Sequence, residues 1–127
     1  MNMKNLQAKV QAYLQDRKWD TVAPGDFAKS ISIEAAELLE HFQWGHPSSE
    51  ETMSDAQKMS EIQSEIADVM IYCLDLCVVL KLDASQIIDA KITHNSDKYP
   101  AHLMKSDGGD EAYMKIKKKY RTGVNSK

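Results

Sequence analysis

The amino-acid sequence predicts an all-α fold, a bundle of four helices. Glycine and proline are scarce, with 5 and 3 among 127 residues, so few of the turn signals that an all-β chain needs are present. Apolar residues instead recur at helical spacing over long segments, which are separated by short polar stretches with capping or helix-breaking residues. We therefore expect one domain in which four helices, joined by short connections, each turn one apolar face inward.

The first helix is predicted over about residues 3 to 17, where Leu6, Val10 and Leu14 recur at helical spacing. A loop that ends in a Pro-Gly pair follows it. Asp26 can cap a second helix, which we expect to run to about residue 44.

The polar stretch from residue 45 to about residue 54 begins with Gly-His-Pro and is predicted to be a flexible connection. A third helix is predicted from near Asp55 to about Leu80. Asp83 is then expected to cap a fourth helix over about residues 84 to 99, which the proline at position 100 closes.

We assign residues 1 to 100 to a single helical domain and residues 101 to 127 to a C-terminal tail. A short helix is expected in this tail around Asp110 to Tyr120. The basic run Lys115 to Arg121 is interpreted as a solvated chain end.

Charge and composition exclude several classes of partner. The net charge of −3 gives no broad basic field, so we expect no nucleic-acid polymer to bind. Charged residues interrupt the longest apolar run, so no membrane span is predicted.

Cys73 and Cys77 lie one turn apart in that run and are interpreted as small core side chains of a reducing compartment. Because the first residues lack an apolar signal region, we expect a cytoplasmic protein.

Two carboxylates of the second helix lie at the margin of its apolar face. At about 100° per residue, Glu34 and Glu37 share a stripe directly beside Ile31 and Leu38, whereas Glu40 points well away from it. An ordinary amphipathic helix places its acids opposite the core, and Glu40 has such a position. Glu34 and Glu37 are therefore the unusual pair.

The third helix carries a second pair, because Glu65 and Asp68 share one stripe. From Ile66 to Leu82 this helix is apolar almost all round, and only Asp68 and Asp75 interrupt it before Lys81. Buried carboxylates are normally paired with cations or bound to a metal. Facing pairs of oxygen donors suit a hard cation such as Mg²⁺ or Mn²⁺. The alternative is a structural network of salt bridges.

Lys91, Asn95 and Lys98 form a polar stripe on the fourth helix. Next to a metal site, such a stripe could bind the phosphates of a nucleotide, although a simple solvated face explains it as well.

Taken together, these segments resemble the MazG-like, all-α NTP pyrophosphohydrolases, most closely the dCTP pyrophosphatase branch, over roughly residues 6 to 100. The resemblance is carried by Arg17-Lys18-Trp19-Asp20, by Glu34 to Trp44 with its closing Phe42-Gln43-Trp44, by Glu65 to Tyr72, by Lys91 to Asn95, and by Lys98-Tyr99-Pro100.

The resemblance implies that Glu34, Glu37, Glu65 and Asp68 are catalytic residues and bind Mg²⁺. It also implies that Trp19, Trp44 and Tyr72 enclose the nucleobase, that Asn95 contacts base or sugar, and that Lys91 contacts phosphate, with Lys98 near the phosphates. A homotetramer built as a dimer of dimers is expected as well.

One departure concerns the phosphate contacts, since Ser96-Asp97 stands where related sequences carry a basic run.

The expected activity is hydrolysis of a (deoxy)nucleoside triphosphate, dCTP or a modified pyrimidine analogue, to the monophosphate and pyrophosphate with Mg²⁺. Two alternatives are open. One is a non-catalytic oligomeric helical interaction module, and the other is a di-iron carboxylate bundle, which neither acid pair favours because the Glu-x-x-His spacing is missing.

Overall fold

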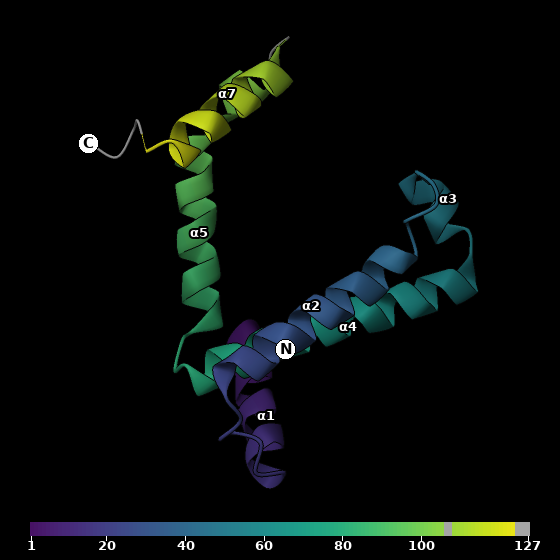
Figure 1. The fold of residues 1–127 in the computed structure, drawn as a ribbon, viewed down its shortest axis with the longest axis vertical. Helices are drawn as coiled ribbons and strands as arrows, with labels where there is room; N and C mark the ends of the chain where they lie inside the picture. Colours follow the sequence, from purple (N-terminus) through teal and green to yellow (C-terminus); the bar gives the residue numbers. More distant parts are fainter. Residues whose placement is uncertain (106–107, 124–127) are drawn as a thin grey trace. The chain divides into compact units, whose positions relative to one another are not determined.

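The computed structural model describes residues 1–105 and 108–123, and these residues form helices joined by short loops, without a strand (Figure 1). The chain divides into two compact units, Met1–Ala84 and Ser85–Lys127. The helices are α1 (Met3–Asp16), α2 (Pro24–Glu40), α3 (Ser49–Met53), α4 (Ala56–Val79), α5 (Ala84–Lys98), α6 (Ala101–Met104) and α7 (Gly109–Arg121). The predicted all-α fold is confirmed, and no helix in the described ranges is both long and apolar enough to cross a membrane.

The start of α2 differs from the prediction. Pro24 is its first residue, Ala23 stands at the N-cap position without a side-chain cap, and Asp26 lies in the first turn. Proline fits this place because its fixed φ is helical and its missing N–H would be unsatisfied there anyway. The helix also ends at Glu40, earlier than the expected residue 44, and a turn follows it.

The segment between α2 and α4 was wrongly predicted to be only a flexible connection, because it contains the helix α3. A capping box starts this helix: Ser48 Oγ accepts from the Glu51 N–H at 3.1 Å, and the Glu51 carboxylate accepts from the Ser48 N–H at 2.8 Å. The predicted cap of α4 is confirmed, since Asp55 Oδ1 accepts from the Lys58 N–H at 3.0 Å.

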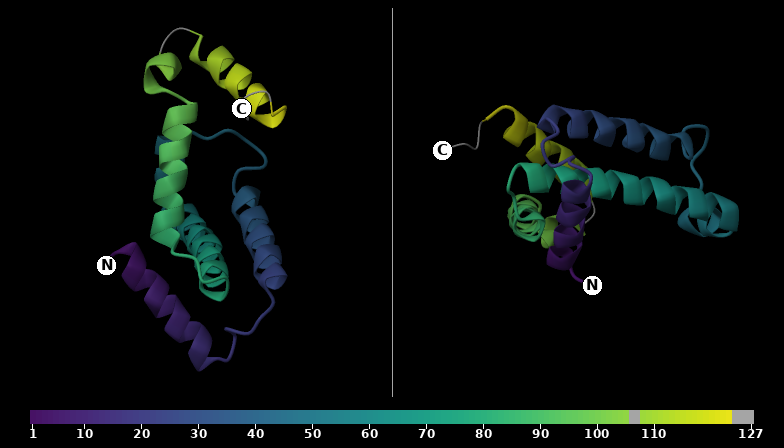
Figure 2. Two further views of the ribbon diagram at one scale, coloured as in Figure 1. Left: turned by 90° about the vertical axis from the view of Figure 1, so that its left-hand side faces the viewer. Right: turned by 90° about the horizontal axis from the view of Figure 1, so that it is seen from below.

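In the first unit, α2 and α4 lie side by side and α1 packs against α4 (Figure 2). Leu74, Cys77 and Ala84 form a buried cluster, and Met3 and Val10 of α1 pack against it. The turn after α4 is held to α1 by one side chain. Gln7 Nε2 donates to the Leu82 carbonyl at 2.7 Å, and Gln7 Oε1 accepts from the Ala84 N–H at 2.9 Å.

The predicted burial of α4 on most sides is only partly met within one chain. Leu74 and Cys77 are buried, whereas Ile66, Met70 and Ile71 are between 41% and 50% exposed. Cys77 is buried as expected, but Cys73 is exposed, and both are free thiols. The single chain therefore leaves one apolar side of α4 open.

The second unit holds most of α5 together with α6 and α7. The rings of Tyr99 and Tyr113 stack with centroids 4.8 Å apart, which joins the end of α5 to α7. Helix α7 contains the short helix that the sequence predicts in the tail.

Candidate metal and nucleotide site

Helices α2 and α4 bring three of the four predicted carboxylates together. One ligand oxygen from each of Glu34, Glu37 and Glu65 lies within 4.8 Å of the other two. The spacing of three within each helix puts a pair of acids on one face, and the side-by-side packing of α2 and α4 turns the two faces toward each other.

Desolvation and mutual repulsion raise the pKa of two acids in this cluster. Desolvation raises the pKa of Glu34, and so do a hydrogen bond with Glu37 and the charges of Glu37, Asp68 and Glu65. Desolvation likewise raises the pKa of Glu65, followed by the charge of Glu37, a hydrogen bond with it and the charge of Asp68, whereas His41 lowers it. Carboxylates that repel one another in this way are stabilised by a shared cation.

Among the described residues, His41 offsets part of this negative charge, but no lysine or arginine supplies the shared cation. None of the four acids forms an ion pair with a lysine or arginine, and Glu65 Oε2 is buried without a hydrogen-bond partner. A set of carboxylate oxygens with one oxygen left unpaired fits a hard divalent ion such as Mg²⁺ or Mn²⁺. The donor atoms at this place are thus suited to the expected metal.

Asp68 lies beside this cluster and also belongs to a second feature. It lines a cavity of about 560 Å³ between α1, the loop after α1, the start of α2, and α4. Lysine and apolar or aromatic side chains form most of the wall: Leu6, Lys9, Val10, Tyr13, Trp19, Val22, Phe27, Ile71 and Tyr72. Two predicted base-pocket residues, Trp19 and Tyr72, therefore meet in one cavity that reaches Asp68.

The aromatic wall on the α1 side is braced by ring contacts. Tyr13 and Trp19 meet edge to face with centroids 5.9 Å apart, and the Arg17 guanidinium lies 3.7 Å from the centroid of the Tyr13 ring. Such contacts hold flat surfaces in place, and a planar heterocycle can stack on them.

Asp75 also lines this cavity, although no role is predicted for it from the sequence. It is 3% exposed, its Oδ1 is buried without a hydrogen-bond partner, and burial raises its pKa to about 6. The available signal was its interruption of the apolar run in α4. That signal identified a buried acid but could not place it in a cavity.

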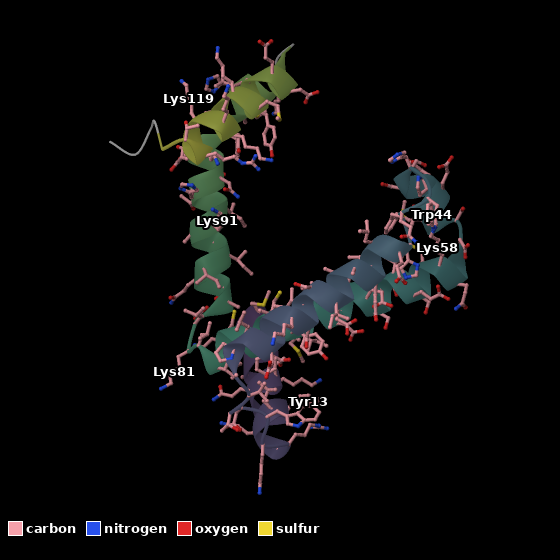
Figure 3. All side chains as sticks on the ribbon, in the orientation of Figure 1. Tyr13, Trp44, Lys58, Lys81, Lys91 and Lys119 are labelled. Atoms are coloured by element: carbon pink, nitrogen blue, oxygen red, sulfur yellow. The ribbon has the colours of Figure 1, made fainter. Side chains whose placement is uncertain are left out.

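Trp44 does not meet Trp19 and Tyr72 within one chain. It is 90% exposed and lines a separate cavity of about 810 Å³ at the α3 end of the α2–α4 pair, which His41, Lys58 and other residues also line. Figure 3 shows Trp44 and Lys58 at this end, away from Tyr13 on α1.

The three predicted residues of the fourth helix lie on α5, in the second unit. Lys91 and Asn95 are exposed, whereas Lys98 is half-buried. The Lys98 ammonium lies 4.3 Å from the centroid of the Tyr120 ring and 5.1 Å from that of Tyr99, so its charge already has partners within this unit.

Comparison with known proteins gives agreeing matches. The MazG-like family model matches residues 29–116. Human dCTP pyrophosphatase 1 is 28% identical over 109 residues, covering 83% of this chain and 61% of the relative, and the Bos taurus protein is 28% identical over 106 residues. The chain thus spans about three fifths of these relatives. The crystal structure of a pyrophosphatase from Archaeoglobus fulgidus DSM 4304 is 39% identical with a TM-score of 0.66, covering 77% of this chain and 92% of that one.

Proposed function

The chain belongs to the MazG-like family, and from this premise we propose that it is a Mg²⁺-dependent nucleoside triphosphate pyrophosphohydrolase. The single observation that carries the proposal is the convergence of Glu34, Glu37 and Glu65 within 4.8 Å. The names of the relatives favour dCTP, or a modified pyrimidine analogue, as the substrate. The products are the nucleoside monophosphate and pyrophosphate.

Glu34, Glu37 and Glu65 are proposed to hold the ion, with Asp68 beside them. A bound Mg²⁺, or Mn²⁺ in its place, would neutralise phosphate charge and lower the pKa of a coordinated water. Glu37 contacts both other glutamates, and we assign it the further task of accepting the proton of the attacking water.

The cavity beside Asp68 is proposed to receive the nucleobase, which Trp19 and Tyr72 enclose. The further roles suggested by the family are a base contact for Trp44, a base or sugar contact for Asn95, and phosphate contacts for Lys91 and Lys98. We place all of these functions in a helical domain of residues 1–100, followed by a C-terminal extension of residues 101–127.

We further propose that the active form is a homo-oligomer, a tetramer built as a dimer of dimers, in the cytoplasm. Support comes from the apolar side chains that one chain leaves open: Ile33 of α2 is 58% exposed, Leu39 is 62% exposed, and Met70 of α4 is 50% exposed. Sedimentation of the purified protein measures this state directly. A Met70→Lys protein that sediments like the wild type would argue against an interface on α4.

The activity is tested with a panel of canonical and modified nucleoside triphosphates and Mg²⁺, in which pyrophosphate and orthophosphate are measured separately. We expect pyrophosphate with the wild type and a loss of at least about 100-fold in rate with Glu65→Gln, because a metal ligand is removed. Glu40→Gln is the matched control, since Glu40 is an exposed acid of α2 outside the cluster.

Three outcomes would contradict the proposal. Orthophosphate as sole product would contradict the assigned bond cleavage. Full activity of Glu65→Gln would contradict the metal site. Absence of hydrolysis with every nucleotide would instead favour the non-catalytic interaction module. The behaviour of such a module should be nearly unchanged by Glu34→Gln.

A further inference from the structure

Asp75 is the one charged side chain that is fully buried among the described residues. It lies in the cavity of about 560 Å³ next to Asp68, and its buried Oδ1 has no hydrogen-bond partner. The other ionisable side chains that line this cavity are Lys9 and Tyr13 from α1 and Asp68 and Tyr72 from α4. None of them forms an ion pair or hydrogen bond with Asp75 in the described chain.

A carboxyl group in such a position is costly for the folded protein. An apolar side chain of similar size would fill the same space without losing the solvation of a charge. The protein itself does not satisfy this acceptor. A ligand that enters the cavity with a hydrogen-bond donor would satisfy the Asp75 carboxylate.

The position of Asp75 along α4 indicates which part of a ligand reaches it. Asp68, Tyr72 and Asp75 follow one another at spacings of four and three, so they share one face. Seven residues of helix separate Asp68 from Asp75, about 10 Å along the axis, which leaves room for a sugar and a base. A nucleotide with its phosphates near the acidic cluster would therefore extend its base toward Asp75.

We infer that Asp75 is a specificity-determining residue, which accepts a hydrogen bond from the amino group of the nucleobase. This inference rests on the proposed function. Cytosine carries an amino group where uracil and thymine carry a carbonyl oxygen, and that oxygen would face the Asp75 carboxylate without a proton between them. A site built to pair with an amino group discriminates strongly, because the wrong base leaves its buried acceptor unpaired.

The test compares dCTP with dUTP as substrates of the full chain with Mg²⁺. We expect the wild type to prefer dCTP, and the ratio of kcat/KM for dCTP over dUTP to fall by about 10-fold or more in Asp75→Asn, whose amide can also donate to a carbonyl. Asp75→Ala removes both the acceptor for the amino group and the carboxylate that faces the uracil oxygen, so it should lose efficiency with dCTP and lower the same ratio without a new hydrogen bond to dUTP. Asp20→Asn, an exposed acid in the loop after α1, is the control.

The outcomes separate this inference from the proposed function. If pyrophosphate is released but Asp75→Asn and Asp75→Ala lower the two efficiencies equally, Asp75 has only a structural role and the inference is overturned while the activity stands. If no nucleotide is hydrolysed, the proposed function fails. Calorimetric titration of dCTP and dUTP then decides the inference: tighter binding of dCTP that Asp75→Asn abolishes supports it, and equal affinities for the wild type overturn it.

Discussion

Replacement of Asp75 by asparagine should stabilise the unliganded protein at neutral and alkaline pH. Asparagine has nearly the same shape but no charge, so it avoids the desolvation that Asp75 suffers. Burial raises the pKa of Asp75 from its ordinary value of 3.8 to about 6. A difference of about two in pKa corresponds to about 3 kcal/mol, which is the upper limit of the expected gain in the free energy of unfolding.

The sign of the pH dependence follows from the direction of this shift. Because the folded state holds the Asp75 proton more tightly than the unfolded state does, this group favours folding fully below about pH 4. That contribution is lost as the pH rises through about 6. The advantage of Asp75→Asn over the wild type should therefore be small near pH 4, grow up to about pH 6, and stay constant above about pH 7.

Urea unfolding at a series of pH values between about 4 and 8 measures this difference. A gain near the upper limit would also raise the Tm by roughly 10 °C. Asp20→Asn, which makes the same change at an exposed position, is the matched control. A difference between Asp75→Asn and wild type that does not change with pH, or a less stable variant at pH 8, would refute the reasoning.

Three other changes test the remaining parts of the first unit. Glu37→Gln should lower the pKa of Glu34 and of Glu65, because the charge and hydrogen bonds of Glu37 raise both. Carboxyl NMR titration without metal measures the two pKa values, and unchanged values would contradict the prediction. Leu14→Ala should cost about 2 to 5 kcal/mol in urea unfolding, since Leu14 is 1% exposed, and a smaller loss would mean that the site collapses around the missing atoms. Ser48→Ala should lower the free energy of unfolding by about 1 kcal/mol and speed hydrogen exchange at the Glu51 amide, which donates to Ser48 Oγ. Unchanged exchange at this amide would argue against the capping box.

The sequence was sufficient for the long helices because their signals are local. The period of apolar residues in α1 and the cap at Asp55 act within a few residues of each other, so no knowledge of packing is needed to find them. The start of α2 was misjudged because two local signals compete there. Pro24 can begin a helix as well as Asp26 can cap one, and the proline comes first in the chain. The helix α3 has a local signal as well, the capping box of Ser48 and Glu51, but its five residues are too few to show an apolar period.

The meeting of the carboxylates was also predictable, because it needs only two regular helices and a shared core. Glu34 and Glu37 lie beside the apolar face of α2, and the stripe of Glu65 interrupts that of α4, so burying both faces brings the acids together. The position of Trp44 could not be obtained in this way. It follows the last turn of α2, where the helical period no longer fixes the direction of a side chain.

Asp68 and Asp75 show where helical periodicity stops being informative. Seven residues at about 100° each return almost to the starting direction, so both acids occupy nearly one stripe of α4 and look equivalent in the sequence. What differs is the neighbouring helix. Asp68 lies close enough to the cluster of α2 and α4 for its charge to act on Glu34. Asp75 instead stands between Leu74 and Cys77 in the chain, and α1 packs against these two residues. The neighbouring helix, and not the stripe, thus decides whether an acid on this face lies beside the carboxylate cluster.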